Sequence, residues 1–250
     1  MGLPDPAVAG LALCASLALV KGLDRLVAHG AVGRKLGRKL VHILVGPGFL
    51  LSWLCFSSAP GARVWAAAVP AANVLRLAAI GSGAWADEAT VKVLARGDAA
   101  GQHPARGELL QGPLYYATVM VACTLGFWRA DPAGVVALMM MCGGDGLADI
   151  VGRRFGAATG PLPWNRDKSW AGSAGCFLGG TAFSGAFLAL FTACGCMNPC
   201  GGDALAVVRA VGAIGLVATA AESLSRQGGL DDNLTVPGSA ILTALALRPF

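Results

Sequence analysis

The chain has 250 residues, of which 55% are hydrophobic and only 13% are charged. Soluble domains carry about a quarter charged residues, so this composition indicates an integral membrane protein. The formal net charge of +5 at pH 7 is too modest to indicate a partner made of nucleic acid.

Apolar segments follow one another along the chain at the length that membrane-spanning helices need. Seven segments are long enough, or nearly long enough, to cross a bilayer. They are 7–28, 40–58, 64–81, 113–128, 133–151, 171–193 and 205–224. A shorter stretch near 235–247 is a marginal eighth, and Pro70 does not exclude a helix in the third. The predicted fold is therefore an all-α polytopic membrane bundle of about seven helices, forming a single domain over the whole chain.

Basic residues gather on the loops of one predicted face. The loops 29–39, 82–112, 152–170 and 225–234 hold twelve lysines and arginines, whereas those of the other face hold only Arg63 and Arg129. The twelve are Arg34, Lys35, Arg38, Lys39, Lys92, Arg96, Arg106, Arg153, Arg154, Arg166, Lys168 and Arg226. Such asymmetry orients membrane proteins, so the basic face is predicted to be cytosolic or, in a plastid, stromal. Every polar motif below falls on or just inside that face, as a single site for an anionic substrate would require.

The first polar motif opens the second span with Arg38, Lys39 and His42. Arg38 and His42 share a helix face, which directs the histidine towards the basic entrance. A lone histidine is more often structural than catalytic, and its functional roles here are phosphate binding or help in deprotonating a hydroxyl. The segment from Glu108 to Tyr116 is ambiguous by physics, since it is a loop that runs into an aromatic-edged span.

The segment Gly143 to Gly156 closes a strongly apolar run. In a helix, Asp145, Asp149 and Arg153 lie one turn apart on a single face. Two carboxylates near a membrane are costly unless they are paired, hydrated or bound to a cation, and Mg²⁺ suits this spacing. Glycines such as Gly144 and Gly146 leave the backbone open to a phosphate. The alternative is an Asp149–Arg153 ion pair that only anchors the helix end.

A second motif, Leu162 to Ser173, precedes the next span. Lys168 is well placed to meet triphosphate charge, while Ser169 and the helix N-terminus offer hydrogen-bond donors. The alternative is an interfacial anchor in which Trp164 and Trp170 are belt residues.

Acidic residues close the last long span. Glu222 ends it, and Asp231, Asp232 and Asn233 follow. An acid there is a candidate for binding magnesium or for accepting a hydroxyl proton. The alternative is an acidic turn in which Asp232 or Asn233 caps the next segment.

Three cysteines, Cys194, Cys196 and Cys200, cluster without a nearby histidine, so a structural zinc site is disfavoured. The chain contains no Gly-x-x-x-x-Gly-Lys-Ser/Thr loop, no protein-kinase signature and no Gly-x-Ser-x-Gly string. Soluble nucleotidases and serine hydrolases are therefore poor fits.

Taken in order, these strings resemble the polyprenol kinase family, which includes phytol kinase and farnesol kinase. The resemblance covers most of the chain, from about residue 38 to residue 237, and six motifs lie in register. They are Arg38 to His42, Gly107 to Tyr116, Gly144 to Gly156, Lys168 to Ser173, Glu222 to Leu224 and Asp231 to Pro237. The resemblance implies a multi-pass membrane protein, in a plastid or another internal membrane. It implies transfer of the γ-phosphate of CTP or UTP to an isoprenoid alcohol, which in a plastid would be phytol salvaged for tocopherol synthesis.

On this basis we expect in-line phosphoryl transfer, with Mg²⁺ held by Asp145 and Asp149. Lys168 would neutralise developing charge, and Glu222 or Asp231 would orient or deprotonate the alcohol. The residues expected to bind nucleotide or phosphate are Arg38, Lys39, His42, Gly144, Gly146, Arg153, Arg154 and Ser169. Those expected to bind the alcohol are Tyr115, Tyr116, Asp232 and Asn233.

Two alternatives remain open. The CDP-diacylglycerol synthases look similar through Gly144 to Gly156 and the following Lys168, but their His-Gly-Gly and paired-Asp element is missing here. The polyprenol kinases usually carry a proline soon after Glu-Ser-Leu, where this chain has Ser225 to Gly229, so the shape of the last loop is open. A small cation-coupled transporter is the non-enzymatic alternative, although no internal repeat is evident.

Overall fold

A computed structural model describes residues 2–95, 105–129, 131–225, 229 and 231–250. Arg96 and Arg226, two residues of the predicted basic face, lie outside these ranges. The regular elements among the described residues are all helical, and one isolated bridge joins Pro161 to Ser169. The predicted all-α class is confirmed.

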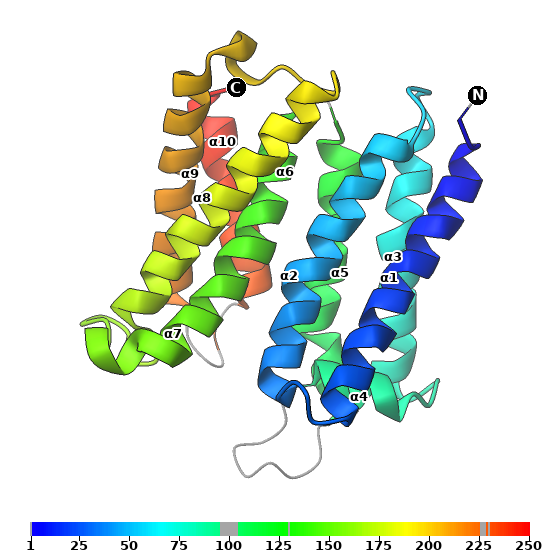
Figure 1. Cartoon of the computed structure of the whole chain (residues 1–250), viewed down its shortest axis with the longest axis vertical. Coiled ribbons are helices and arrows are strands. Elements are labelled where there is room, and N and C mark those ends of the chain that lie inside the picture. Colours follow the sequence, from blue (N-terminus) through cyan, green and yellow to red (C-terminus); the bar gives the residue numbers. More distant parts are fainter. Residues whose placement is uncertain (1, 96–104, 130, 226–228, 230) are drawn as a thin grey trace. The chain divides into compact units, whose positions relative to one another are not determined.

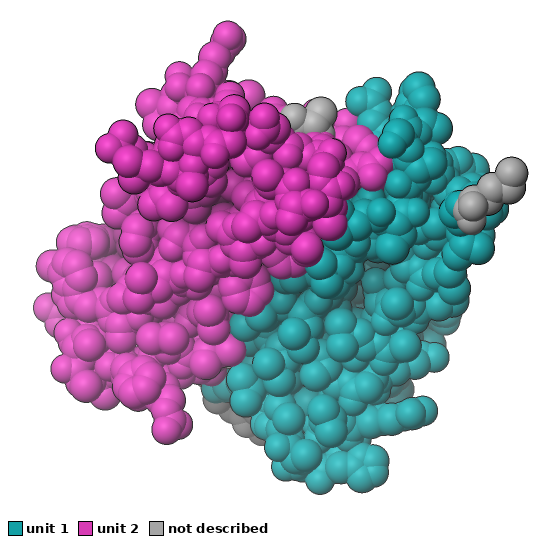
Figure 2. Space-filling model, turned by 45° about the horizontal axis from the view of Figure 1, so that its top comes forward, with its two compact units in different colours: residues 1–122 teal, residues 123–250 magenta. Residues whose placement is uncertain are grey.

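The chain divides into two compact units, residues 1–122 and residues 123–250 (Figure 2). The expectation that both act as one kinase domain stays a prediction, because a division by packing does not separate functions.

Unit 1 is built from four long helices and a short one. Its elements are α1 (Asp5–Ala28), α2 (Arg34–Ser52), the 3₁₀ turn η1 (Trp53–Cys55), α3 (Ala62–Ser82), α4 (Glu88–Leu94), the 3₁₀ turn η2 (Arg106–Leu110) and α5 (Gly112–Gly126), whose last turn belongs to unit 2. Helix α1 packs against α2 and α3. Leu77 and Ile80 of α3 join Ala117 of α5 in one buried cluster.

Unit 2 is built around a long helical rod and three further helices. Its elements are α6 (Pro132–Met139), η3 (Met140–Asp145), α7 (Gly146–Thr159), α8 (Trp170–Ala193), the 3₁₀ turn η4 (Pro199–Gly202), α9 (Ala204–Leu224) and α10 (Asp232–Leu247). Helix α8 packs on α7, η3 and α9, and α10 packs on α6 and α9. The α7–α8 connection and the start of α10 lie at one end of this unit, and the α8–α9 connection lies at the other (Figure 1).

The segment η3 is a π-helical insertion in the rod that runs from α6 to α7. A π turn contains an extra residue, so it rotates the chain that follows it relative to the chain before it. Asp145 is the last residue of this segment, and its side chain is buried. The α-helical spacing read from the sequence contains no signal for this insertion.

Glycines bring α8 close to this rod. A β-carbon built on Gly179 would lie 2.9 Å from the carbonyl oxygen of Gly143, and one on Gly175 would lie 3.0 Å from that of Leu147. Small residues permit such backbone approach in membrane helices, where packing rather than water exclusion drives association. The glycine-rich composition thus has a structural use at this interface.

Six helical segments of the described chain are long and apolar enough to cross a membrane. They are 5–28, 62–82, 106–126, 132–159, 170–193 and 204–224. Helix α2 was expected to span at 40–58 but ends at Ser52, and its charged first turns keep it out of this set. Helix α10 has 16 residues and is shorter than the others. Helix α3 continues through Pro70, as predicted.

Candidate active site

The loop between α7 and α8 is folded tightly on itself and fixes Lys168. Helix α7 ends at Thr159 and is capped by Gly160, whose φ of 79° suits a residue without a side chain. The Leu162 amide donates to the Lys168 carbonyl (2.9 Å), and the Lys168 amide donates to the Asn165 carbonyl (3.1 Å). Lys168 is therefore held by backbone bonds on both sides.

Asn165 attaches this loop to the end of α9. Its side chain is buried, and Nδ2 donates to the carbonyl oxygens of Ser223 (3.0 Å) and Ser225 (2.8 Å). Trp164 Nε1 also donates to Ser223 Oγ (3.2 Å). The carbonyls at a helix C-terminus lack partners within the helix, so this asparagine satisfies them while aligning Lys168 with α9. Sequence reasoning missed this role, because a single asparagine inside a polar loop carries no motif.

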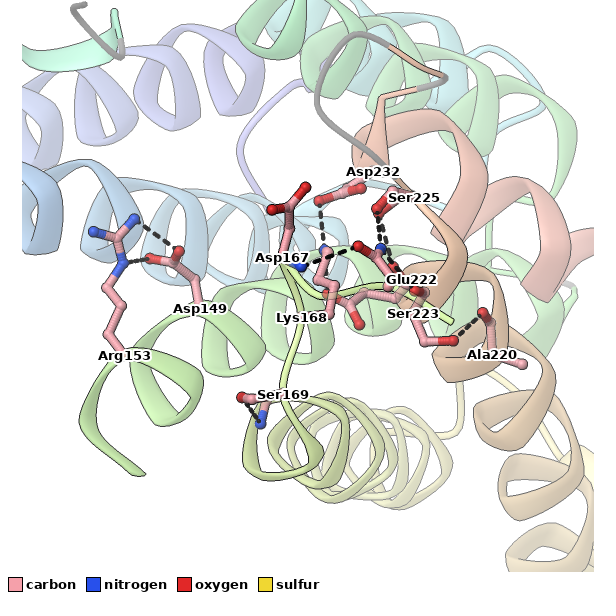
Figure 3. A network of polar contacts seen from close by, with 12 residues as sticks. Asp149, Arg153, Asp167, Lys168, Ser169, Ala220, Glu222, Ser223, Ser225 and Asp232 are labelled. Atoms are coloured by element: carbon pink, nitrogen blue, oxygen red, sulfur yellow. Dashed lines mark hydrogen bonds and ion pairs between the residues drawn. The ribbon is translucent and has the colours of Figure 1, made fainter. Parts of the chain in front are cut away.

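Lys168 contacts acids from two other elements. Its Nζ lies 2.5 Å from Glu222 Oε1 on α9 and 3.3 Å from Asp232 Oδ2 at the start of α10. Figure 3 shows the ammonium between these two carboxylates. Asp145 completes the group, because one carboxylate oxygen each of Asp145, Glu222 and Asp232 lies within 4.8 Å of the other two. Three acids distant in sequence thus meet beside one lysine.

The electrostatics of this cluster favour a cation. Glu222 and Asp145 are 2% and 5% exposed, and buried carboxylates are costly without neutralising partners. Burial disfavours the charge on Lys168, but the carboxylates of Glu222 and Asp232 outweigh it and raise the pKa of the lysine. A divalent cation would add positive charge beside these three carboxylates.

Two oxygens in this region support the same conclusion. Glu222 Oε2 and Asn233 Oδ1 are buried and accept no hydrogen bond within the part of the chain that the structure describes. Carboxylate and amide oxygens are ligands that hard divalent cations prefer. The residues present therefore fit a divalent metal ion.

Curated proteins similar over nearly the whole chain give this site its context. A probable phytol kinase of Triticum aestivum is 41% identical over 247 residues, covering 99% of this chain and 79% of that protein. The chain belongs to the polyprenol kinase family. Phytol kinase 1 of Arabidopsis thaliana is 39% identical over 227 residues (91% of this chain, 71% of that protein). Farnesol kinase of the same plant is 37% identical over 219 residues (88% and 67%).

All three relatives are described as chloroplastic. No model of a protein family matches the chain, and no solved structure matches it. Membership of the polyprenol kinases disfavours both the cytidylyltransferase and the transporter alternatives.

Within this polyprenol kinase, Asp149 lies apart from the three-acid cluster. Its two carboxylate oxygens accept hydrogen bonds from Nη2 and Nε of Arg153, both at 2.9 Å (Figure 3). This is the Asp149–Arg153 ion pair that the sequence offered as the alternative to a metal site. Metal binding by Asp149 stays a prediction, while Asp145 is found with partners that the spacing did not indicate.

Several predicted residues have structural contacts of their own. Asp231 caps α10, since its Oδ1 accepts from the Asn233 amide at 2.9 Å and from Asn233 Nδ2 at 2.7 Å. Ser169 caps α8 by accepting from the Gly172 amide at 3.1 Å. The cap of α10 is thus Asp231, which precedes Asp232 and Asn233, the caps considered in the alternative interpretation. These bonds leave Asp231 less suited than Glu222 to accept a proton.

The phosphate-binding predictions for the glycines and arginines stay predictions. Gly144 and Gly146 are buried, and a β-carbon on Gly144 would lie 3.2 Å from the Cys176 carbonyl of α8. Helix packing therefore accounts for Gly144. The guanidinium of Arg154 lies 5.7 Å from the ring centroid of Phe155.

The remaining predicted residues belong to unit 1. The rings of His42 on α2 and Tyr116 on α5 lie 4.5 Å apart, and Tyr116 Oη donates to the His42 carbonyl at 2.9 Å. Arg38 and Lys39 lie one turn before His42 on α2, and Tyr115 precedes Tyr116. The structure thus brings His42 and Tyr116 together, which their separation in sequence did not indicate.

Proposed function

We propose that this chain is a prenol kinase, which transfers the γ-phosphate of CTP or UTP to an isoprenoid alcohol such as phytol, farnesol or geranylgeraniol. The observation that carries the proposal is its similarity to relatives named phytol kinase and farnesol kinase. The acid–lysine cluster in unit 2 supports it, because ionisable groups buried in membrane proteins are functional by default.

In this proposal Asp145, Glu222 and Asp232 hold Mg²⁺ together with the triphosphate. The ion would supply charge neutralisation on the phosphate oxygens, which dominates catalysis of phosphoryl transfer. Lys168 shares Glu222 and Asp232 with it and adds a second positive charge beside the transferred group. Glu222 Oε2, which has no described partner, would serve as a ligand of the ion.

We further propose that the enzyme lies in a chloroplast membrane with this cluster facing the stroma, where it would salvage phytol for tocopherol synthesis. The supporting observations are the chloroplastic relatives, the apolar helices and the excess of basic residues on the loops at the same predicted face.

A substrate panel tests the reaction. Purified protein is incubated with phytol, farnesol, geranylgeraniol or phosphatidate and with labelled CTP, UTP or ATP, each with and without Mg²⁺. We expect a labelled prenyl monophosphate that requires Mg²⁺. Label transferred to phosphatidate as a cytidylyl group, or no phosphorylated prenol from any pair, would contradict the proposal.

Variants test the site itself. Asp145→Asn and Glu222→Gln keep the size of each side chain and remove its charge, so we expect a loss of activity of about a hundredfold or more. Asp203→Asn is the matched control, because Asp203 is an exposed cap of α9 and asparagine also caps helices. Wild-type activity in all three variants would show that the charges of Asp145 and Glu222 are not needed for the reaction.

A further inference from the structure

Unit 1 contains a pocket whose lining includes none of the residues of the acid–lysine cluster. Helices α1, α2, α3 and α5 surround it, and its empty volume is about 490 Å³, part of which opens to the surroundings. The wall is mainly apolar and includes Leu13, Leu17, Phe49, Val69 and Met120.

Asn73 places a polar group in this apolar wall. It lies near the middle of the membrane-spanning helix α3, and no hydrogen bond joins its side-chain amide to a residue in the described ranges. An amide left without a partner in apolar surroundings costs free energy. The amide offers one acceptor and two donors, which match a hydroxyl group that both donates and accepts.

Arg76, one turn further along α3, also lines the pocket, and Asn73 and Arg76 are together called its polar end. Its Nη2 donates to Asp87 Oδ2 at 2.7 Å and to the hydroxyl of Thr90 at the start of α4. These bonds fix the guanidinium, while Nε and Nη1 donate to no residue in the described part of the chain. The pocket therefore combines a long apolar wall with fixed donors at one end.

We propose that this pocket binds the isoprenoid alcohol, with the tail along the apolar wall and the hydroxyl at Asn73 and Arg76. The inference rests on the proposed prenol kinase activity for the identity of the occupant. A branched hydrocarbon with a single terminal hydroxyl matches both the wall and the polar end. The pocket assigns Asn73 and Arg76 to substrate recognition, a role that no motif of the sequence indicated.

Binding is tested without catalysis. A photoreactive isoprenoid alcohol with a diazirine on its tail is irradiated with the purified chain in detergent, and the labelled peptides are identified by mass spectrometry. We expect label on α1, α3 or α5 in the absence of nucleotide, with loss of label when phytol competes. Label confined to residues 123–250, or label that phytol does not displace, would overturn the inference.

Kinetics test the polar end. Asn73→Leu keeps the size and removes the hydrogen bonds, so we expect KM for the alcohol to rise about tenfold, the equivalent of one hydrogen bond. KM for the nucleotide is expected to stay unchanged. Leu75→Ala is the control, because Leu75 is 72% exposed on the same helix and does not line the pocket. A fall in kcat with an unchanged KM for the alcohol would contradict the assignment.

Chain length tests the apolar wall. Ser16 of α1 lines the pocket, and Ser16→Phe would fill part of it. We expect a larger rise in KM for geranylgeraniol than for geraniol, which is half as long, and an equal rise for both would count against a tail-binding role. The two proposals fail separately. Competed labelling of the pocket without phosphorylated product refutes the kinase activity alone, whereas turnover without labelling refutes the pocket alone.

Discussion

Lys168 is linked to several elements of unit 2. It shares two carboxylates, lies near a third, and is attached to α9 through the bonds of Asn165. Breaking a buried ion pair by removing one partner costs about 3–5 kcal/mol, because the charge left behind has no compensation. Lys168 therefore contributes to both the stability of the fold and the charge balance of the site.

Replacement of Lys168 by methionine tests this double role. Lys168→Met should lower the free energy of unfolding by about 3 kcal/mol, measured by denaturation in detergent micelles. Added Mg²⁺ should raise Tm more in the variant than in the wild type, because the ion then provides the missing positive charge. Lys92→Met is the control, since Lys92 is exposed on α4 and contacts none of the three acids. An identical magnesium response in both variants would argue against metal binding at the cluster.

The pH dependence of Lys168 follows from its carboxylate neighbours. Glu222 and Asp232 raise the pKa of Lys168 despite its burial. A raised pKa in the folded state gives a stabilisation that is fully present below the unfolded value of about 10.4 and is lost only as pH rises through the folded value. The difference in stability between wild type and Lys168→Met should therefore not shrink as pH rises from about 6 to about 9. A difference that shrinks over that range would show that Lys168 loses its proton there.

At the scale of elements, the contact between α8 and the α6–η3–α7 rod depends on glycines, which have no side chain to keep the helices apart. Gly179 lies so close to the Gly143 carbonyl that a methyl group would meet backbone, which cannot move aside as a side chain can. Overpacking of this kind costs about 1–3 kcal/mol. Because η3 ends in Asp145, a shift of α8 would also displace a carboxylate of the site.

Gly179→Ala should therefore lower both stability and activity, whereas Gly185→Ala should lower neither. Gly185 is on the same helix with nothing within 4 Å of a built β-carbon, and alanine there is favourable by about 0.5–1 kcal/mol. Thermal unfolding in detergent and the rate of prenol phosphorylation measure the two effects. Equal behaviour of the two variants would show that this close approach is not required.

The elements themselves were largely predictable from the sequence. Apolar runs of membrane length located most of the helices, and the prediction of a continuous helix through Pro70 was confirmed. The π insertion at η3 was not predictable, because its only trace is one extra residue in a run that is apolar all round. The end of α2 at Ser52 was also missed, since the apolar sequence continues beyond it.

The acid cluster was predictable in its members but not in its grouping. Local spacing paired Asp145 with Asp149, because positions four apart share a helix face. The structure instead groups Asp145 with Glu222 and Asp232, acids brought near by the packing of η3, α9 and α10. Long-range contacts of this kind leave no periodic signal. Asn73 was missed for a related reason, since a single amide in an apolar span has no motif around it.

At the scale of the whole molecule, the acid–lysine cluster and the mainly apolar pocket belong to different units. Unit 2 provides the three carboxylates and Lys168, and unit 1 provides the pocket with Asn73 and Arg76. The two reactants of the proposed reaction differ in the same way, one being a water-borne anion and the other a membrane lipid. A bundle of membrane-spanning helices suits this combination. Its helix ends are exposed to water, where the anion is dissolved, and its middle lies at the depth of the lipid hydrocarbon, where the tail is soluble.

The orientation of unit 2 in the membrane can be tested through its connections. Helix α8 has 24 residues, which extend about 36 Å at about 1.5 Å per residue, and the hydrocarbon core is about 30 Å thick. The α7–α8 and α8–α9 connections should therefore lie on opposite sides of the membrane. The exposed Asp167 lies in the first connection, and Cys194, Cys196 and Cys200 lie in the second.

A membrane-impermeant maleimide distinguishes the two sides in sealed thylakoid or envelope vesicles of known orientation. Asp167→Cys, made with the three loop cysteines replaced by serine, should react from the stromal side, because basic loops are usually retained on that side of a membrane. The chain with its natural cysteines should react in the second connection only after the vesicles are opened. Mass spectrometry of the labelled peptides separates these sites from Cys14 and Cys55, which are also exposed. If Asp167→Cys reacts only in opened vesicles, the site faces away from the stroma, and the nucleotide would have to come from the other compartment.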